Sequence, residues 1–304
     1  MPDAPARVVV AGASGLLGRA LVDALTADGV PVTRLVRGAP AAPTPLVREV
    51  AWAPGVEPLD PAVVEGAAAA VCLNGATLGR FPWTSAYKRE LLRSRLTPTH
   101  ALATAVRRAG VPVLVGASAV GFYPARSGGA LTERSPRGDS FLADLCARWE
   151  AAARSAGPAT RVVHLRTAPV THPGGVLGPL VLLTRLGLSG PIGRGTQSWP
   201  WIGLDDAVRA IRHTIDAGLE GPVNLAGPTR AVANDLGFAL AQRLNRPFLL
   251  RAPAWAMRLV LGRDATDALL TSDMHVVPAV LEASGFTFAH RTVEDAVAAA
   301  LPRA

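Results

Sequence analysis

Residues 8–22 read VVVAGASGLLGRALV, and this stretch decides the fold. An apolar run leads into Gly12, Gly15 and Gly18, and an amphipathic pattern over 16–27 follows. A strand that turns sharply into a helix needs glycine for the turn, for close approach to a pyrophosphate and for packing of the helix on the strand. The stretch therefore predicts a dinucleotide site at the start of a helix, with a purely structural turn as the alternative. The residues expected to contact the dinucleotide are Gly12, Ser14, Gly15, Leu16, Leu17 and Gly18.

The end of the next apolar run indicates which dinucleotide is bound. An acidic residue about 20 positions after the glycines would accept hydrogen bonds from the ribose of NAD. The sequence VTRLVRG supplies Arg34 and Arg37 there and no acid. Because guanidinium groups suit a 2′-phosphate, we expect NADP rather than NAD, with Arg37 as the contact. A solvated Arg37 in a surface loop is the alternative.

Apolar runs alternate with helical patterns along the first two thirds of the chain. This alternation is typical of an α/β fold with a doubly wound parallel sheet of the Rossmann type, covered on both faces. The expected strands are 7–12, 31–36, 47–52, 68–74, 111–118, 160–167 and, late in the chain, 221–228. The expected helices are 16–27, 84–109, 141–156, 229–245, 252–270 and 292–301, the last opening with Thr292 and Asp295 at capping-box spacing.

The amino-acid composition changes near residue 169, after which glycine and proline become frequent. We expect an NADP-binding Rossmann domain over 1–170 and a smaller C-terminal substrate lobe over 171–304, with 204–228 returning to the sheet. The lobe is expected to lie over the carboxyl edge of the sheet and to close on a small-molecule substrate.

The composition and charge of the chain argue against a nucleic-acid-binding protein and against a membrane-spanning protein. The chain has 304 residues, a net charge of +8 and a pI of about 10.9. Its basic residues are scattered, and the densest run, KRELLRSR at 88–95, alternates with leucines at helical spacing, so we expect a solvated helix face and no nucleic-acid partner. No apolar run approaches the length of a membrane span, and residues 1–7 lack a signal-peptide pattern. We therefore expect a cytoplasmic monomer or homodimer.

Few other residues carry recognisable chemistry. Cys72 and Cys146 lie in apolar or helical segments and are expected to be core residues. The six histidines show no metal-ligand spacing, so no metal site is expected. The tryptophans Trp83, Trp199 and Trp201 would either line a substrate pocket or pack in the core.

The chain as a whole resembles the extended and atypical short-chain dehydrogenases/reductases, and within them the NAD-dependent epimerase/dehydratase-like family. The resemblance covers nearly the full length in order. It is carried by GASGLLGRAL, LNGA, WTSAYKRELLRSRLTPT, GASAVGFY, LTERSPRGDSFLADLCARWEAAA, LRT, SWPWIGLDDAVRAI, GPVNLAGP and VVPAVLEASGFTF. It implies a Rossmann fold, a dinucleotide cofactor and a substrate bound at the carboxyl edge of the sheet.

The resemblance also implies roles for individual residues near the cofactor. Asn74, Gly75 and Ala76 match a turn beside the adenine and ribose, although a buried Asn capping its own turn is the alternative. Thr167 matches a residue that approaches the nicotinamide ribose or amide. Asp205 and Asp206 match the family pattern too, but capping of the helix that begins there explains them better.

Two hydroxyl groups are the catalytic candidates that the resemblance implies. Ser118 matches a serine that hydrogen-bonds a substrate carbonyl next to the nicotinamide, with a small residue that ends a buried strand as the alternative. Tyr123 follows a few residues on, where a phenol could reach the same oxygen.

The sequence departs from most short-chain dehydrogenases in its acid–base residues. These enzymes use a Tyr with a Lys four residues later, which lowers the pKa of the phenol. The one lysine, Lys88, follows Tyr87 directly. In the matching segment the Lys position falls near Cys146, and the Tyr position near Phe141 or Leu142. A phenol without that lysine is a usable acid and a poor base, so reduction of a carbonyl on a small or sugar-like metabolite by NADPH is favoured. A nucleotide-sugar epimerase or dehydratase and a non-catalytic NADP(H)-binding regulator are the alternatives.

Overall fold

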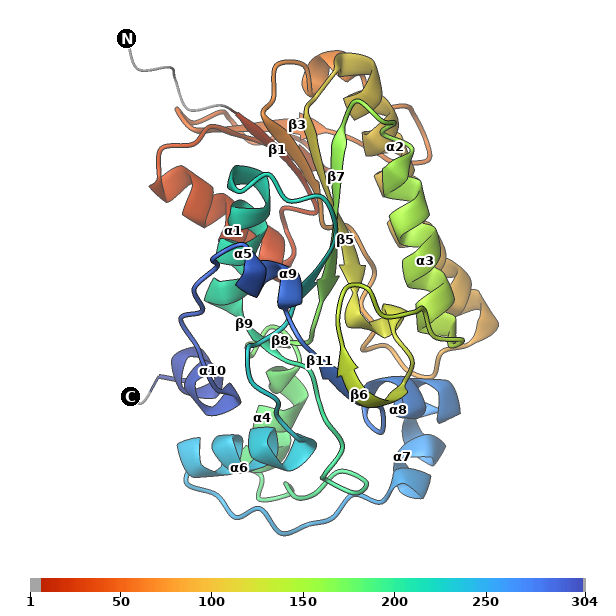
Figure 1. Ribbon diagram of the computed structural model, residues 1–304, viewed down its shortest axis with the longest axis vertical. Coiled ribbons are helices and arrows are strands. Elements are labelled where there is room, and N and C mark those ends of the chain that lie inside the picture. The colour runs from red at the N-terminus through yellow and green to blue at the C-terminus, as the bar shows by residue number, and fades with distance from the viewer. Residues whose placement is uncertain (1–6, 303–304) are drawn as a thin grey trace.

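The apolar start of residues 8–22 forms an interior strand of a parallel sheet (Figure 1). The computed structural model describes residues 7–302, with backbone alone for residues 126 and 127. Seven parallel strands lie in the order β10-β7-β5-β4-β1-β2-β3. They are β1 (Val8–Ala11), β2 (Val32–Val36), β3 (Val47–Ala51), β4 (Ala69–Cys72), β5 (Val113–Ala119), β7 (Arg161–Thr167) and β10 (Gly221–Leu225). The predicted strands and the doubly wound α/β fold are confirmed.

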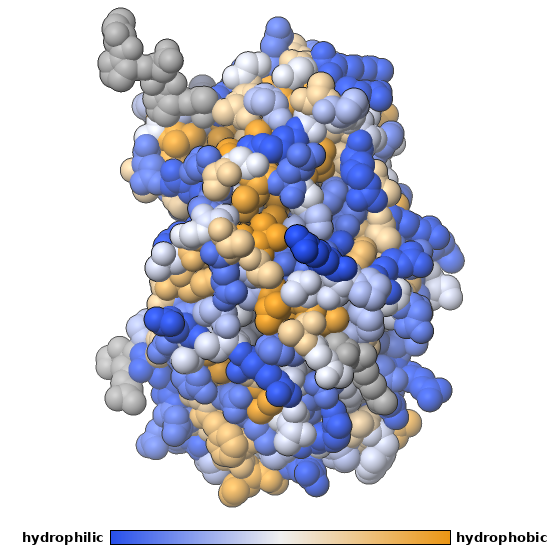
Figure 2. Space-filling view, in the orientation of Figure 1, coloured by the Kyte–Doolittle hydropathy of each residue, from blue (hydrophilic) through white to orange (hydrophobic). Residues whose placement is uncertain are grey.

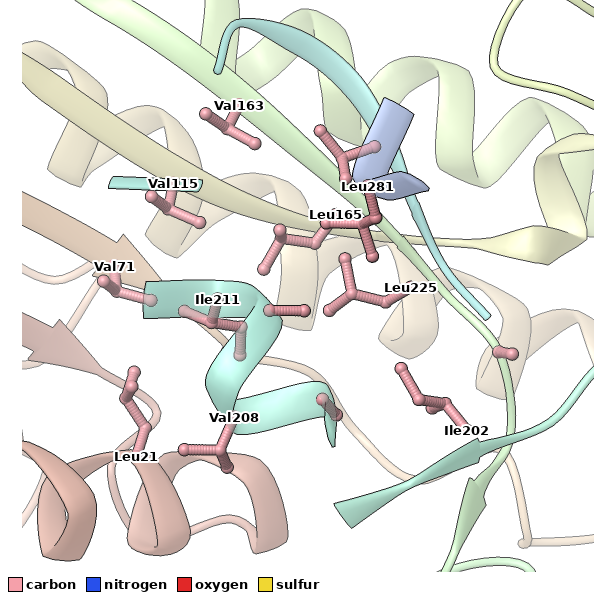
Figure 3. Close-up of a cluster of buried hydrophobic side chains, with 14 of the residues drawn as sticks. Leu21, Val71, Val115, Val163, Leu165, Ile202, Val208, Ile211, Leu225 and Leu281 are labelled. Carbon is pink, nitrogen blue, oxygen red and sulfur yellow. The ribbon is translucent and has the colours of Figure 1, made fainter. Parts of the chain in front are cut away.

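Helices cover both faces of this sheet because its strands are apolar on both sides. Val8 and Val10 of β1 face α1 (Leu16–Ala27) and α5 (Leu204–Asp216), whereas Val9 and Ala11 face α2 (Ser85–Ala109) and the end of α3 (Phe141–Arg154). Figure 3 shows the first of these layers, in which Leu21 of α1 and Ile211 of α5 point towards the strand residues Val71 and Val115. Transfer of these side chains from water is the main source of stability.

Some of the helices begin directly after a residue whose side chain caps them. Thr84 Oγ1 accepts a hydrogen bond from the N–H of Tyr87 at the start of α2, and Ser140 Oγ accepts one from Ala143 at the start of α3. The predicted capping box of Thr292 and Asp295 is present at the start of α10 (Val293–Ala300).

The rest of the chain builds a smaller lobe at the carboxyl edge of the sheet (Figure 1). The expected helix 252–270 is two helices, because Gly262 has φ 86° and interrupts the hydrogen-bond ladder. The expected helix 229–245 begins only at residue 233. The lobe contains α4 (Leu177–Arg185), α6 (Ala233–Arg243), α7 (Ala254–Leu261), α8 (Arg263–Leu269), α10 and the pair β8 (Val170–Thr171) and β9 (Ile202–Gly203). The short helix α9 (Ala279–Ala283) packs instead on the central sheet beside β10, with Leu281 fully buried there.

Two further strands join the lobe to the Rossmann segment. β6 (Arg126–Leu131), which lies between β5 and α3 in the chain, pairs in parallel with β11 (Asp273–Val276). Short 3₁₀ turns at Pro61–Val63 and Val120–Phe122 complete the secondary structure. The sequence patterns did not predict β6, β8, β9, β11, α4 or α9. The division of the chain into domains near residue 170 stays a prediction.

The surface mixes polar and apolar residues. On the face drawn in Figure 2, hydrophobic residues stand in small groups between hydrophilic ones. Within residues 7–302, none of the helices has both the length and the apolar character required to cross a bilayer. Residues 1–6, on which the expectation about a signal peptide partly rests, lie outside the described residues. The predicted cytoplasmic location stays a prediction.

We expect Leu165→Ala to lower the free energy of unfolding by about 2–5 kcal/mol, because Leu165 is fully buried in β7 and its removal leaves a cavity between the sheet and α5. Urea unfolding measures this loss. The matched control is Leu182→Ala on α4, where the side chain is 59% exposed and little change is expected. Equal losses in the two variants would contradict this assignment of the core.

Candidate functional site

The residues predicted to bind a cofactor come together at one edge of the sheet. The glycine turn follows β1, Arg37 follows β2 and Asn74 follows β4, while Ser118 and Thr167 lie at the ends of β5 and β7. Since all of these strands run parallel, their carboxyl ends meet at the same edge, which is where ligands bind in open α/β sheets.

Each of the three glycines is required for a different reason. Gly12 has φ 81°, and a Cβ on it would lie 2.7 Å from the carbonyl carbon of Leu73 in the turn after β4. A Cβ on Gly18 would lie 2.2 Å from the Gly12 oxygen, so only glycine lets α1 pack this closely on the end of β1. Gly15 is exposed, and its nearest neighbour to an added Cβ is the Gly12 oxygen at 3.4 Å. Gly15 therefore lies on the open side of the turn, where a ligand can approach the backbone.

The N-terminus of α1 is arranged to receive an anion. Gly15 is its N-cap and supplies no side-chain hydrogen bond, and the first turn contains no acidic residue. Uncapped N–H groups and the positive end of the helix dipole favour a phosphate at this position. Gly174 and Gly175 face the start of the helix, since a Cβ on either would lie 3.4 Å from a methyl group of Leu16. The predicted contacts Ser14 and Leu17 are exposed and half-buried, respectively.

The two arginines of β2 have different surroundings. Arg34 Nη1 pairs with Glu49 Oε1 of β3 at 3.0 Å and is thus occupied within the sheet. Arg37 is exposed just beyond the strand, at the carboxyl edge. Among the described residues no acidic group pairs with Arg37, so its guanidinium is available to a ligand phosphate. Arg34, the other arginine of the sequence VTRLVRG, is paired with Glu49 and is therefore not available to a ligand phosphate.

The turn after β4 is held by α2. The Ala76 N–H donates to Ser94 Oγ at 3.0 Å, and Arg95 Nη2 donates to the Ala76 oxygen at 3.0 Å. Asn74 Oδ1 accepts from the Cys72 thiol at 3.6 Å, so part of its amide serves its own turn, as in the alternative reading. Gly75 is exposed, and a Cβ on it would lie 3.1 Å from the Arg95 guanidinium. Arg95 is buried, so the expectation that the run 88–95 forms a solvated helix face is wrong for this arginine.

A buried ion pair lies beside the ends of β5 and β7. Arg166 Nε donates to Glu150 Oε1 at 2.9 Å and Arg166 Nη2 to Glu150 Oε2 at 3.1 Å, a bidentate geometry. Ser118 Oγ donates to Glu150 Oε1 at 2.9 Å. The guanidinium also lies 3.5 Å from the centre of the Phe122 ring. Sequence patterns missed this pair, although a charged residue inside the apolar strand RVVHLRT was a signal for it.

Tyr123 is part of the same network. Its side chain is 1% exposed, its Oη donates to Asn224 Oδ1 at 2.6 Å, and it accepts from Arg166 Nη1 at 3.1 Å. Burial raises the pKa of the phenol above its ordinary value. The Tyr123 hydroxyl thus links Arg166 to β10, and its predicted catalytic role stays a prediction.

The positions of the usual Tyr and Lys pair carry no proton-transfer group. Leu142 and Cys146 lie one turn apart on the buried face of α3. Burial, together with the charge of Glu150, raises the pKa of the Cys146 thiol to about 12, so the thiol is neutral at pH 7 and cannot replace a lysine ammonium. Both cysteines are buried and free, as predicted. Thr167 is half-buried and donates to the Leu165 oxygen at 3.2 Å.

The structure assigns the remaining candidates to packing. Trp83 and Trp201 are buried and Trp199 is half-buried, and the indole N–H of each donates to a backbone carbonyl, so core packing is the better account of them. Gly203 is the N-cap of α5, so neither Asp205 nor Asp206 caps this helix as predicted. Asp206 instead accepts hydrogen bonds from the N–H groups of residues 289 and 290 and fixes the C-terminal segment against α5.

Comparison with known proteins identifies the family. A family model described as "NAD dependent epimerase/dehydratase family" matches residues 8–226, which contain the glycine turn and the whole central sheet. The chain belongs to this family. A second model, described as a domain of unknown function (DUF1731), matches residues 252–300. The predicted resemblance is thereby confirmed.

Several relatives are similar to this epimerase-family chain over nearly its full length. Epimerase family protein Mb2239 of Mycobacterium bovis is 39% identical over 303 residues, with 99% of each chain covered. The crystal structure of human epimerase family protein SDR39U1 (isoform 2) with NADPH superposes with a TM-score of 0.83 at 31% identity, covering 96% of this chain and 97% of that one. A nucleoside-diphosphate sugar epimerase from Corynebacterium glutamicum gives 0.77 at 32% identity, covering 98% of this chain and 58% of that one.

We expect Tyr123→Phe to lower the free energy of unfolding by about 1–3 kcal/mol, because it leaves the buried Asn224 Oδ1 without its donor. The control is Tyr87→Phe, whose hydroxyl bonds the carbonyl of the exposed residue Thr77, so that water can replace it and the loss is smaller. Urea unfolding compares the two. A Tyr123→Phe variant as stable as the parent would show that this hydroxyl is not a structural member of the network.

Proposed function

We propose that this protein binds NADP(H) and reduces a carbonyl group of a small or sugar-like compound. The observation that carries the proposal is the uncapped N-terminus of α1 behind the glycine turn, with Arg37 free at the end of the neighbouring strand. The NADPH named in the human relative's structure and the family description support the choice of cofactor.

The residues present fit the parts of NADP(H). The N–H groups at the start of α1 would receive the diphosphate, and Gly15 leaves the room that a side chain would fill. Arg37 would pair with the 2′-phosphate, which NAD lacks. The turn of Asn74, Gly75 and Ala76 would lie beside the adenine ribose. Thr167, at the end of β7, would lie near the nicotinamide end.

In this proposal Ser118 polarises the substrate carbonyl. Bound NADPH would supply the hydride, and the substrate oxygen would take its proton from water. The Ser118 hydroxyl donates to Glu150 in the structure, and it would exchange this acceptor for the substrate oxygen. The exchange leaves no carboxylate unpaired, because Arg166 continues to hold both oxygens of Glu150. A donor aimed at an oxygen that gains negative charge stabilises the transition state.

Among the described residues, the positions of the usual Tyr and Lys pair hold no suitable base, which favours reduction over epimerisation. Epimerisation through a keto intermediate needs a group that removes a proton from an alcohol and later returns it. Leu142 cannot do this, and the Cys146 thiol, with its pKa raised to about 12 by burial, is not such a base at pH 7. The nucleotide-sugar epimerase or dehydratase therefore remains the second enzymatic candidate.

One observation favours a protein that binds NADP(H) without catalysis. The side chains of both predicted catalytic residues are buried, Ser118 against Glu150 and Tyr123 against Asn224. A regulatory protein that senses NADP(H) would keep the cofactor site and could lack exposed acid–base groups. Turnover, and not binding, separates this candidate from the reductase.

We expect NADPH to bind more tightly than NADH, measured by fluorescence titration of the purified protein. Arg37→Ala should weaken NADPH binding by about tenfold to a hundredfold, the value of one or two charge-assisted hydrogen bonds, and leave NADH unchanged. Arg93→Ala removes the same charge from an exposed position on α2 and serves as the control. Tighter binding of NADH would refute the role given to Arg37.

We expect the protein to oxidise NADPH in the presence of at least one member of a panel of aldehydes, ketones and keto sugars. Ser118→Ala should lower kcat/KM by roughly a hundredfold while the affinity for NADPH stays the same. The loss of NADPH absorbance and the titration above measure the two effects. Binding of NADPH without turnover on any compound would favour the regulator, and inversion of a sugar centre without net NADPH consumption would favour the epimerase.

A further inference from the structure

A cleft of about 780 Å³ opens in the small lobe, away from the glycine turn. It lies between the middle of β6, the start of α7 and the loop that precedes β9. Its volume is in the range of small-molecule sites. Its walls include four arginines, Arg194, Arg230, Arg251 and Arg258, whereas among its described lining residues Asp273 alone is acidic.

The arginines differ in how they are held. Arg230 Nε donates to Ser198 Oγ at 2.7 Å, which fixes its guanidinium at the rim. Arg194 pairs with Asp273 at 2.8 Å and Arg258 with Asp267 at 2.8 Å. Arg251 is exposed and has no pairing partner among the described residues. The cleft therefore carries excess positive charge, and the pKa of His275 in its wall is lowered by burial and by Arg230.

A buried acceptor adds a second requirement. Gln197 is 1% exposed, and its Nε2 donates to the carbonyls of Ile192 and Leu270, which fixes the orientation of the amide. Gln197 Oε1 has no donor among the described residues, although it is buried in the lining. An unpaired buried acceptor is costly, so a ligand hydroxyl that donates to it would gain affinity.

The cleft offers little to a nucleobase. Apart from the imidazole of His275, none of its described lining residues has an aromatic ring, so a base would lack the ring stacking that commonly holds it. The guanidinium groups suit phosphate groups, which they bind in bidentate geometry. Charge and hydrogen bonding together thus describe a ligand rich in phosphate and hydroxyl groups.

We propose that this cleft binds a small polyhydroxy compound that carries one or more phosphate groups and no nucleobase. Phosphate groups pair with Arg230, Arg251 and Arg258, and a hydroxyl donates to Gln197 Oε1. That this compound is the substrate of the reaction would rest on the function proposed above. The existence of the binding site does not depend on that function, because ligand binding to the cleft is measured without turnover.

The test is isothermal titration of the full chain with fructose 1,6-bisphosphate and, separately, inorganic pyrophosphate. Both titrations use protein saturated with NADP⁺, so that the turn before α1 is not the site measured, and the preceding NADPH titration reports the cofactor site independently. We expect saturable binding, tighter for the sugar bisphosphate. Arg251→Ala should weaken it about tenfold and the double variant with Arg258→Ala about a hundredfold. Arg93→Ala on α2 should leave it unchanged.

Further arms test the ligand chemistry. Gln197→Leu should weaken binding of fructose 1,6-bisphosphate and leave binding of pyrophosphate, which has no hydroxyl for this acceptor, unchanged. UDP should bind no more tightly than pyrophosphate; much tighter binding of UDP would overturn the exclusion of a nucleobase. Absence of saturable binding, or equal affinity in the parent and both arginine variants, would overturn the site. Thermal melts confirm that the variants are folded, which is expected because Arg251 and Arg258 are exposed.

Discussion

The structure depends on how closely α1 approaches the end of β1. Gly18 lets the helix pack on the Gly12 carbonyl, and Gly12 lets the same turn pack on the backbone after β4. These contacts fix the direction of α1, so that its N-terminus points into the edge where β1, β4 and β5 end. The anion-receiving end of the helix and the turn at Asn74 are consequences of this packing. A larger residue at Gly12 or Gly18 would disturb both at once.

The central sheet could be predicted because each of its strands and helices has a recognisable pattern within its own residues. Seven apolar runs and the helices between them give the periodicity of buried parallel strands and of helices packed on them. The small lobe gives no such signal. Strands such as β8 and β9 contain two residues each, and their pairing depends on residues about 30 positions apart. Gly262, which divides the helix expected over 252–270, acts through a backbone angle that the amphipathic pattern does not show.

The positions of the proposed cofactor residues in the fold could be predicted from the sequence, whereas the surroundings of the catalytic candidates could not. The glycine spacing predicts a tight turn between strand and helix, and an arginine just after a parallel strand lies at the carboxyl edge of the sheet. Neither position depends on residues far away in the sequence. Whether a hydroxyl is open to a substrate depends instead on distant partners: Asn224 lies 101 positions from Tyr123, and Glu150 lies 32 positions from Ser118. The resemblance placed both hydroxyls correctly near the carboxyl edge but could not show that a buried ion pair, Glu150 with Arg166, already engages them.

The pairing of β6 with β11 has a consequence for how this chain can change over evolutionary time. Residues 252–300 match a family model of their own. Yet β11 lies within this segment and completes a ribbon whose other strand precedes α3. A replacement segment would have to supply an edge of the same length and register for β6. A C-terminal segment without such a strand would leave β6 with an unpaired edge, and exposed strand edges favour aggregation.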